Sequence, residues 1–254
     1  DHRLHMQDFS SYTNNQDLFG AAFAIPDIEQ ADRFLLLGCS IKQELPLAAL
    51  RMRKAVAEGA KVSVISSEEY SSNVNLAQQV TLHPDLWLQH LCGILQAALD
   101  NGADLSGHAL PDWAKNKTPE SDQIECAKTL MAGINKMLWL GSGVYRHPQA
   151  GKLIYIAKLL ASAIGAKIAI VPDGANSIGL SKVGILPQAG DDACKDLRSM
   201  FDGACKCFIL IGFDPEHDLS LSGLADAAFV NSDLIVSLNS FKLLFIIYYW
   251  IFSI

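Results

Sequence analysis

Apolar residues along this chain gather in short runs, and several of these runs end at a glycine. Runs bounded in this way are typical of strands that are buried on both faces of a parallel sheet. Between them lie longer stretches whose apolar residues recur at the spacing of a helix. The runs occupy residues 33–38, 61–66, 136–143, 166–171, 207–212 and 233–238, and the helical stretches 45–59, 83–102 and 149–164. This alternation predicts an α/β fold of mainly parallel strands with right-handed crossovers.

Two of the predicted helices carry an apolar stripe that should face a sheet. The first is expected to end at Gly59 and the second at Gly102, because glycine suits the position that follows a helix. The stripes consist of Leu47, Leu50, Ala55 and Val56 in the first helix and of Leu88, Leu91, Leu95 and Leu99 in the second.

The series of strands and helices predicts two Rossmann-like units. The first would span residues 1–132 with a helical extension, and the second residues 133–240. Residues 103–123, rich in Gly, Pro, Lys and Asp, are the best candidate for a linker. Residues 241–254 are almost wholly apolar yet shorter than the roughly 17 residues that a spanning helix needs. We interpret this tail as a non-native end, with a buried pair of strands as the alternative.

Three of the apolar runs share one plan, in which a strand ends at a glycine and a polar loop follows. The glycines are Gly38, Gly141 and Gly212, and each loop contains a proline further on. In a doubly wound sheet such loops lie at the carboxyl ends of strands, where ligands bind. The sequence therefore directs the search for a site to these three loops.

The overall charge narrows the classes of function. The formal net charge is −7 and the pI about 5.4, so the chain lacks the basic surface that nucleic-acid binding requires. The first residues contain no apolar signal region, and the six cysteines are expected to be reduced thiols. Since the chain does not begin with Met, we interpret it as a fragment.

The recognisable chemical motifs are weak. The turn at residues 141–143 has two glycines, but Arg146 stands where a dinucleotide fingerprint has its third, and no P-loop occurs. Ser40 lacks the second glycine of a nucleophile elbow. The other candidates have ordinary structural interpretations: Cys194, Cys205 and Cys207 as buried thiols, His83 and His90 as surface or interface histidines, and Asp191 and Asp192 as acids at the start of a helix.

Several segments resemble the molybdopterin oxidoreductases, and more closely the large peripheral-arm subunit of bacterial NADH-quinone oxidoreductase, which is respiratory complex I. Their order and spacing carry the resemblance, and together they span most of residues 1–240. The segments are 1–10 (DHRLHMQDFS), the strand–helix–strand unit at 28–66, 138–166, 172–180 (PDGANSIGL) and 208–219 (FILIGFDPEHDL).

The resemblance implies a place for the pterin cofactor, and this chain departs from the family at that place. Pterin-binding members carry Asn-Pro after the first glycine and Asp-Pro-Arg after the next strand, where they hold the guanosine and phosphate ends of the cofactor. This chain has Ser40-Ile41 and Ser66-Ser67-Glu68 instead. Carboxylates would also repel a pyrophosphate. The carboxylates concerned are Glu44, Glu68, Asp214 and Glu216.

We therefore expect retained loops without a cofactor, a metal or a catalytic residue. The vestigial pterin-type positions are Gly38, Cys39, Ser40, Gly141, Gly143, His147, Gly212, Asp214 and Pro215. Bulky side chains are expected to narrow the former cleft: Ile41, Leu45, Tyr145, Arg146 and Phe213. Arg146 is expected to pair with Asp214 or Glu216 in a partly desolvated ion pair.

The resemblance implies a structural role in electron transfer from NADH to quinone. The iron–sulfur clusters of the family are expected N-terminal to this segment, the partners would be other peripheral-arm subunits of complex I, and no membrane span is expected. The location would be the cytoplasmic side of the bacterial inner membrane. Two alternatives remain: a fragment of a formate or nitrate reductase type of enzyme that binds the pterin between the two units, and a free-standing nucleotide-binding protein that uses the Gly141 turn.

Overall fold

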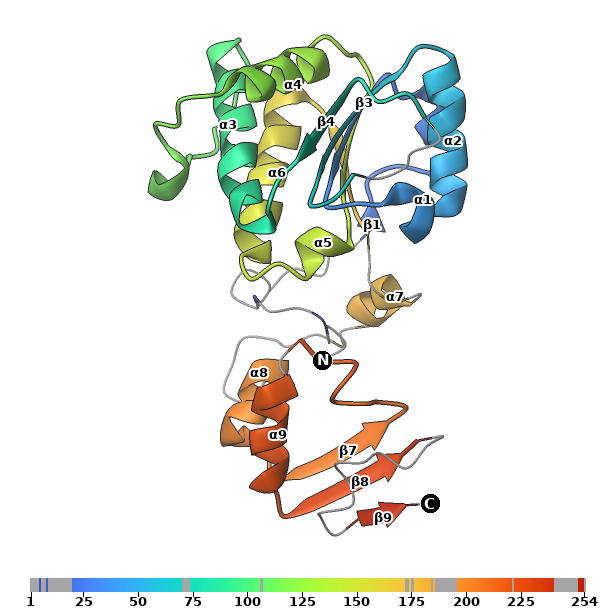
Figure 1. Ribbon diagram of the computed structural model, residues 1–254, viewed down its shortest axis with the longest axis vertical. Helices are drawn as coiled ribbons and strands as arrows, with labels where there is room; N and C mark the ends of the chain where they lie inside the picture. The colour runs from blue at the N-terminus through green and yellow to red at the C-terminus, as the bar shows by residue number, and fades with distance from the viewer. Residues whose placement is uncertain are drawn as a thin grey trace.

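A computed structural model shows a mixed α/β fold with two sheets (Figure 1). One sheet has six strands in the order β1-β6-β5-β2-β3-β4, and the other has three in the order β7-β8-β9. The structure describes residues 5, 8, 20–69, 74–105, 107–171, 174, 176–183, 185, 196–220, 222–239 and 251–253.

The larger sheet contains five parallel strands, with the short β1 added antiparallel at one edge. β2 lies between β3 and β5, and Leu37 is in register with Ile65 on one side and Leu140 on the other. The strands are β1 (Gly20–Ala21), β2 (Arg33–Leu37), β3 (Lys61–Ser66), β4 (Gln78–Thr81), β5 (Lys136–Leu140) and β6 (Lys167–Ile170). The mainly apolar runs of β2, β3, β5 and β6 fit a sheet that is covered on both faces, whereas β4 is polar and alternates between half-buried and exposed residues.

Helices cover the two faces of this sheet, and Figure 1 shows α2 on one side and α3, α4 and α6 on the other. The first group is η1 (Ile25–Gln30), α1 (Ile41–Glu44) and α2 (Pro46–Ala57), and the second is α3 (Trp87–Asp100), α4 (Ser121–Met131) and α6 (Ala150–Ile164). Successive residues of a strand point to opposite faces of the sheet and so belong to different hydrophobic cores. In β5, Leu138 and Leu140 pack with the second group of helices, and Met137 and Trp139 pack with the first.

The smaller sheet is parallel and has helices packed on one face. β7 (Cys207–Ile211), β8 (Leu234–Leu238) and β9 (Ile251–Ser253) form it, with α8 (Leu197–Ser199), η4 (Met200–Ala204) and α9 (Ser222–Val230). Phe201, Phe208 and Phe229 form its aromatic centre, with ring centroids 5.1–6.0 Å apart. The remaining elements are η2 (Pro84–Leu86), η3 (Asp112–Ala114), α5 (Ser142–Tyr145) and α7 (Ser177–Lys182).

The predicted fold class is confirmed, and all six predicted strands are present, but the strands are grouped differently from the prediction. β5 and β6 were expected in a second unit over residues 133–240, whereas β5 pairs with β2 in the larger sheet. The sheet therefore continues across the expected boundary at residue 132, because the matching apolar runs of β2 and β5 pair side by side. The predicted linker 103–123 contains η3 and the start of α4. In the tail, only residues 251–253 are described, as β9.

The predicted apolar stripe of the first helix was wrong at its two leucines and right at Ala55, which is buried, and at Val56, which packs in part against the core. Leu47 is 71% exposed and Leu50 43%, whereas Ala48 and Met52 are buried with Ala55 against the sheet. The buried face of α2 is formed by Ala48, Met52 and Ala55 at helical spacing, and the two leucines lie outside this face. In α3 the prediction holds at its centre, since Leu91 and Leu95 are fully buried. In the part of the chain that the structure describes, no helix is long and apolar enough to cross a membrane.

Candidate functional site

Two of the three predicted loops meet at the carboxyl ends of β2 and β5. Because these strands are adjacent and parallel, the loop 38–40 lies against the loop 141–143; we call them the paired loops. The backbone N–H of Gly141 donates to the Leu37 carbonyl at 3.0 Å, and that of Gly143 to the Gly38 carbonyl at 3.0 Å. The structure therefore joins the two predicted loops into one site.

The glycines of the paired loops are required by close packing. A Cβ on Gly141 would lie 2.3 Å from the Cα of Cys39, and one on Gly143 would lie 2.9 Å from Cη2 of Trp87. Gly38 also has a φ of +54°, and its Cβ would lie 2.7 Å from the ring of Trp87. The loops and this tryptophan are thus in direct contact, and the space that a ligand would need beside the glycines is filled by protein.

A single carboxylate connects the paired loops. The backbone N–H of Ser40 donates to Oε1 of Glu44 at 2.7 Å, and the backbone N–H of Ser142 donates to Oε2 at 2.8 Å. Neither N–H has an acceptor within its own helix, since Ser40 precedes α1 and Ser142 begins α5. Free N–H groups of this kind bind phosphate oxygens in nucleotide sites. Here both are satisfied by an anion that the chain itself supplies.

His147 packs against Trp87, which contacts the paired loops, and its ring is held in the neutral form. It is buried, its plane stacks on Trp87 at a centroid distance of 6.1 Å, and its Nδ1 accepts the N–H of Gln149 at 2.9 Å. Nε2 lies 3.1 Å from the Pro84 carbonyl, to which it donates. Burial lowers the pKa of His147, partly offset by its bond to Pro84. Its contacts are those of a packing residue.

A second helix start is capped in the same way. Oδ2 of Asp8 accepts the backbone N–H of Gly151, in the first turn of α6, at 2.9 Å. A carboxylate near the first turn also interacts favourably with the helix dipole. Asp8, from the segment 1–10, therefore caps the start of α6, the helix that follows the loop 141–143.

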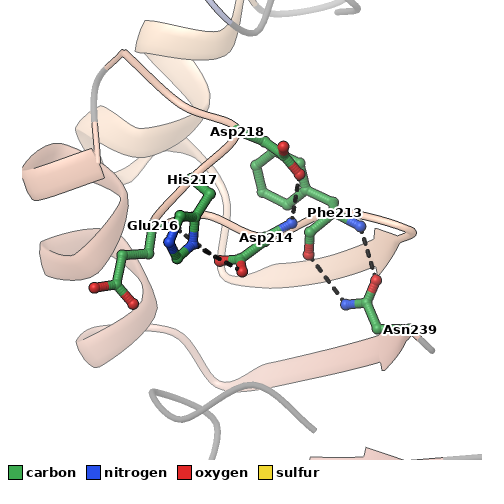
Figure 2. A network of polar contacts seen from close by, with 6 residues as sticks. All are labelled: Phe213, Asp214, Glu216, His217, Asp218 and Asn239. Atoms are coloured by element: carbon green, nitrogen blue, oxygen red, sulfur yellow. Dashed lines mark hydrogen bonds and ion pairs between the residues drawn. The ribbon is translucent and has the colours of Figure 1, made fainter. Parts of the chain in front are cut away.

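The third loop, after β7, belongs to the smaller sheet (Figure 2). Gly212 has a φ of +56° and donates its N–H to Leu238 at 2.9 Å. Asn239 accepts the N–H of Phe213 at 2.8 Å and donates to its carbonyl at 3.0 Å. Asp218 accepts the N–H of Asp214 at 2.8 Å, while the Asp214 carboxylate pairs with His217 at 3.1 Å. This loop is closed by local contacts of its own.

The bulky residues predicted to narrow one common cleft point to different places. Ile41 is buried in the core beside α2, and Tyr145 in the core on the opposite face of the sheet. Arg146 is exposed, so the partial desolvation assumed for its ion pair is missing on the arginine side. Its pairing with Asp214 or Glu216 stays a prediction. Leu45 lines an apolar pocket, and Phe213 packs in part against the core.

Two interpretations of cysteine and histidine were wrong. Cys207 was expected to be buried, but it is exposed, because it starts an edge strand on the face that carries no helix. His90 was expected at a surface or an interface, but it is buried within the chain beside Gln123, and burial lowers its pKa. His83 is exposed as expected. Cys194, Asp191 and Asp192 lie outside the residues that the structure describes. Within the described part of the chain, no group of three potential metal ligands occurs.

Sequence reasoning missed the contacts that close the site. Glu44 was recognised as a charge that would repel a pyrophosphate, but not as the acceptor for both loops; its place four residues after Ser40 was the available signal. Trp87 and Asp8 carried no signal, since Trp87 reaches the paired loops, and Asp8 the first turn of α6, from a distant part of the sequence. Cys39, also in the first loop, is buried, and this burial, together with the charge of Glu44, raises its thiol pKa well above the ordinary value.

Comparisons with known proteins give one family and a fold likeness. A model of the molybdopterin oxidoreductase family matches residues 3–241. No curated protein matches the chain significantly. Among solved structures, a chain of the formyltransferase/hydrolase complex FhcABCD from Methylorubrum extorquens, determined with methylofuran, is similar with a TM-score of 0.53 and 10% identity. The alignment covers 88% of this chain and 62% of that one, and at this identity it shows the fold alone.

Proposed function

Because the chain belongs to the molybdopterin oxidoreductase family, we propose that it is a structural part of an oxidoreductase and holds no pterin itself. More specifically, we propose that it is the pterin-enzyme-like region of the large peripheral-arm subunit of a bacterial NADH-quinone oxidoreductase. In that role it would support electron transfer from NADH to quinone without carrying electrons.

The Glu44 bridge carries the proposal that no pterin binds. The resemblance assigns the guanosine and phosphate ends of the cofactor to the loops after β2 and β3. At the first of these, Glu44 already accepts the N–H groups of Ser40 and Ser142. At the second, Ser66 donates its hydroxyl to the carbonyl of Glu68, so the loop folds back on itself. The residues present do not fit a pyrophosphate, which would meet a carboxylate instead of free N–H donors.

The fold by itself does not require redox chemistry. A chain of similar fold is found in a complex whose described activities are formyl transfer and hydrolysis. Function resides in a site and not in the fold that carries it. This observation supports a protein in which the family's architecture is kept after the cofactor site has changed.

The assignment to complex I rests on the order of the resembling segments. If it is correct, the partners are other peripheral-arm subunits, the location is the cytoplasmic side of the inner membrane, and iron–sulfur clusters lie N-terminal to this segment in the full subunit. These clusters need runs of closely spaced cysteines. Such runs in the reading frame upstream of this segment would support the assignment, and their absence would contradict it.

A direct experiment follows the chain in its own cells. The chromosomal copy would carry an affinity tag, and solubilised membranes would be separated on a native gel stained for NADH oxidation with an artificial acceptor. We expect the tag to migrate with the stained band and the purified band to lack molybdenum. Migration of the tag away from every NADH-oxidising band would contradict the assignment to complex I.

The rival function is a pterin-dependent oxidoreductase of the formate or nitrate reductase type. The family membership favours this alternative as much as the proposed one. The two differ in metal content, because a pterin-dependent enzyme would contain stoichiometric molybdenum or tungsten. Elemental analysis of the chain, produced in a host that makes the cofactor, separates them.

A further inference from the structure

A buried histidine and a buried glutamine join α3 to the start of α4. His90, on α3, is 4% exposed, and its Nδ1 lies 3.2 Å from Nε2 of Gln123, in the first turn of α4. Oε1 of Gln123 accepts the backbone N–H of Glu120 at 3.0 Å, as the glutamine of a capping box does. One side-chain amide therefore caps one helix and binds the histidine of the other.

This contact fixes which nitrogen of His90 carries the proton. Because Oε1 of Gln123 is the acceptor for Glu120, its Nε2 is the amide NH₂ group and donates to Nδ1 of the histidine. Nδ1 then carries no proton, and the proton of the neutral ring lies on the other nitrogen. That nitrogen is buried and has no acceptor among the described residues. The observed structure thus holds the neutral ring by a bond that only the unprotonated Nδ1 can accept.

A proton on Nδ1 is incompatible with this arrangement. The ring would present an N–H to the NH₂ group of Gln123, and two donors would face each other. Turning the amide over does not remove the conflict, because its NH₂ group would then face the N–H of Glu120. The amide cannot move toward α3 either, because it packs directly on Gly93, where there is no room even for a Cβ. The remaining movement carries the first turn of α4 away from α3.

The first turn of α4 is held less firmly than the rest of the helix. Gln123 is its buried side chain. The other buried residues of the helix come later: Cys126, Ala127 and Leu130. The far end is also tied to β2, because Nε of Arg33 donates to the Thr129 carbonyl at 2.9 Å. The start of the helix can therefore open while its end stays in place.

We propose that His90 and Gln123 form an acid-sensitive switch, in which protonation of His90 releases the start of α4 from α3. Burial lowers the pKa of His90, and the carboxylates of Asp122 and Glu120, both at the start of α4, offset this only in part. Among the described residues, no charge from α6 or from the sheet acts on the ring. The paired loops take no part, so the proposal stands whether or not a pterin binds there.

Two cysteines are the other titratable groups buried in these helices. Burial raises the pKa of Cys92, on α3, to about 11, and that of Cys126, on α4, to about 12. Both thiols are therefore neutral at any pH at which the histidine titrates. His90 is the group of this contact whose charge changes in weak acid.

Acid is expected to favour the open form. In the closed form the pKa of His90 lies below its value in water of about 6.5, which the ring regains when α4 moves away. The open form therefore binds more protons, and its population grows below about pH 6.5 by at most about tenfold per pH unit, until the pKa of the closed form is passed. Opening also withdraws the Asp122 carbonyl, which accepts Nε2 of Gln78 at 2.8 Å. The edge strand β4 then loses this bond.

Cys126 reports the opening, because it lies one turn after Gln123 and is 2% exposed. The full chain is treated with 4,4′-dithiodipyridine, which reacts with thiols in acid, and mass spectrometry gives the labelling rate at each cysteine. Division by the rate of the free peptide 121–131 at the same pH removes the pH dependence of the reagent. We expect this ratio to rise at least about fivefold between about pH 7 and pH 5.

Cys39 is the reference for unfolding of the whole chain, because it lies in the core on the other face of the sheet. Its labelling rate is divided in the same way by that of a free peptide that contains it. This ratio should stay within about twofold over the same range. An equal rise at both cysteines, or no rise at Cys126, would overturn the proposal.

The sharpest variant is Gln123→Glu, which keeps the shape but replaces the donor by a carboxylate. The carboxylate accepts both the N–H of Glu120 and the Nδ1–H of a protonated His90. Acid should then strengthen the contact, and the ratio for Cys126 should stay flat or fall between about pH 7 and pH 5. A packing role for Gln123 would leave the acid response as it is, so a rise equal to that of wild type would contradict the switch.

A second variant, His90→Gln, removes the titrating group and should abolish the acid-induced rise at Cys126. His108→Gln is the matched control, because His108 is exposed in the loop before α4 and should leave the rise unchanged. A rise that persists in His90→Gln would assign the opening to another group and would refute the proposal. Loss of the rise in both variants would do the same.

Discussion

The loops after β2 and β7 begin with the same local structure and end in different surroundings. Gly38 and Gly212 have φ values of +54° and +56°, and each donates its N–H to the end of the neighbouring parallel strand, at Ile65 and Leu238. A Cβ on Gly38 would strike Trp87, whereas one on Gly212 would meet nothing within 4 Å. Gly38 is buried and Gly212 exposed.

The difference shows what the local motif does and does not decide. An apolar strand that ends in a left-handed glycine fixes the turn of the chain in both places. The surroundings then decide how the polar groups beyond the turn are satisfied. In the paired loops a carboxylate from α1 bridges two distant segments, since Glu44 and Ser142 are separated by 98 residues. After β7, an amide and two acids close a single loop.

The largest expected effect comes from alanine at the two matched glycines. Gly212→Ala adds left-handed strain of about 1 kcal/mol. Gly38→Ala adds the same strain and also overpacks the contact with Trp87, for a total of about 3 kcal/mol. Urea unfolding monitored by circular dichroism would give both values. Equal destabilisation by the two substitutions would show that Trp87 adapts and that the loop is not tightly packed.

The next effect tests the carboxylate. Glu44→Gln keeps the shape of the side chain but presents an NH₂ group to one of the two backbone donors. We expect a loss of about 2 kcal/mol in the free energy of unfolding, since hydrogen bonds to a charged acceptor are worth about that much. Glu216→Gln is the control, because Glu216 is exposed in the third loop and should change stability by less than about 0.5 kcal/mol. Equal losses in the two variants would contradict the role of Glu44 as a bridge.

A smaller effect is expected at Asn239, which holds the loop after β7. Asn239→Ala removes three hydrogen bonds between neutral groups in a half-buried place, two to Phe213 and one to the hydroxyl of Ser237. The expected loss is about 1 kcal/mol, less than for Glu44→Gln. Asn231→Ala, which removes one exposed bond to Ala227, serves as the reference. A larger loss in the free energy of unfolding for Asn239→Ala than for Glu44→Gln would contradict this expectation.

The smallest effect is a pH dependence of stability that arises from His147, which packs beside Trp87 near the paired loops. Burial lowers the pKa of His147 below its unfolded value of about 6.5. The unfolded chain then binds more protons than the folded one in acid, so stability falls as the pH drops through about 6.5 and levels off below the folded pKa. His147→Gln should reduce the slope of the unfolding free energy across this range, measured by urea unfolding at a series of pH values. An unchanged slope would assign the dependence to other groups, such as His90.

The sequence predicted the strands and the glycine turns because both depend on local pattern. The apolar runs that contain β2, β5 and β7, and the glycines that end them, are visible in neighbouring residues, whereas the left-handed conformation of Gly38 and Gly212 was not predicted. The partners of those strands depend on tertiary packing, and the pairing of β2 with β5 was missed for that reason. The same holds for the site, where Glu44 was visible as a charge but its second hydrogen bond depends on a loop far away in the chain.

The central claim is that the carboxylate of Glu44 occupies the place of a cofactor phosphate between the paired loops. The most direct test follows the backbone amide signals of Ser40 and Ser142 while guanosine diphosphate, which carries the guanosine and pyrophosphate of the family's cofactor, is added to the wild-type chain. We predict that neither signal moves at millimolar concentration, because both N–H groups already donate to Glu44. Saturable movement of both signals would mean that the nucleotide displaces the carboxylate, and it would contradict the account.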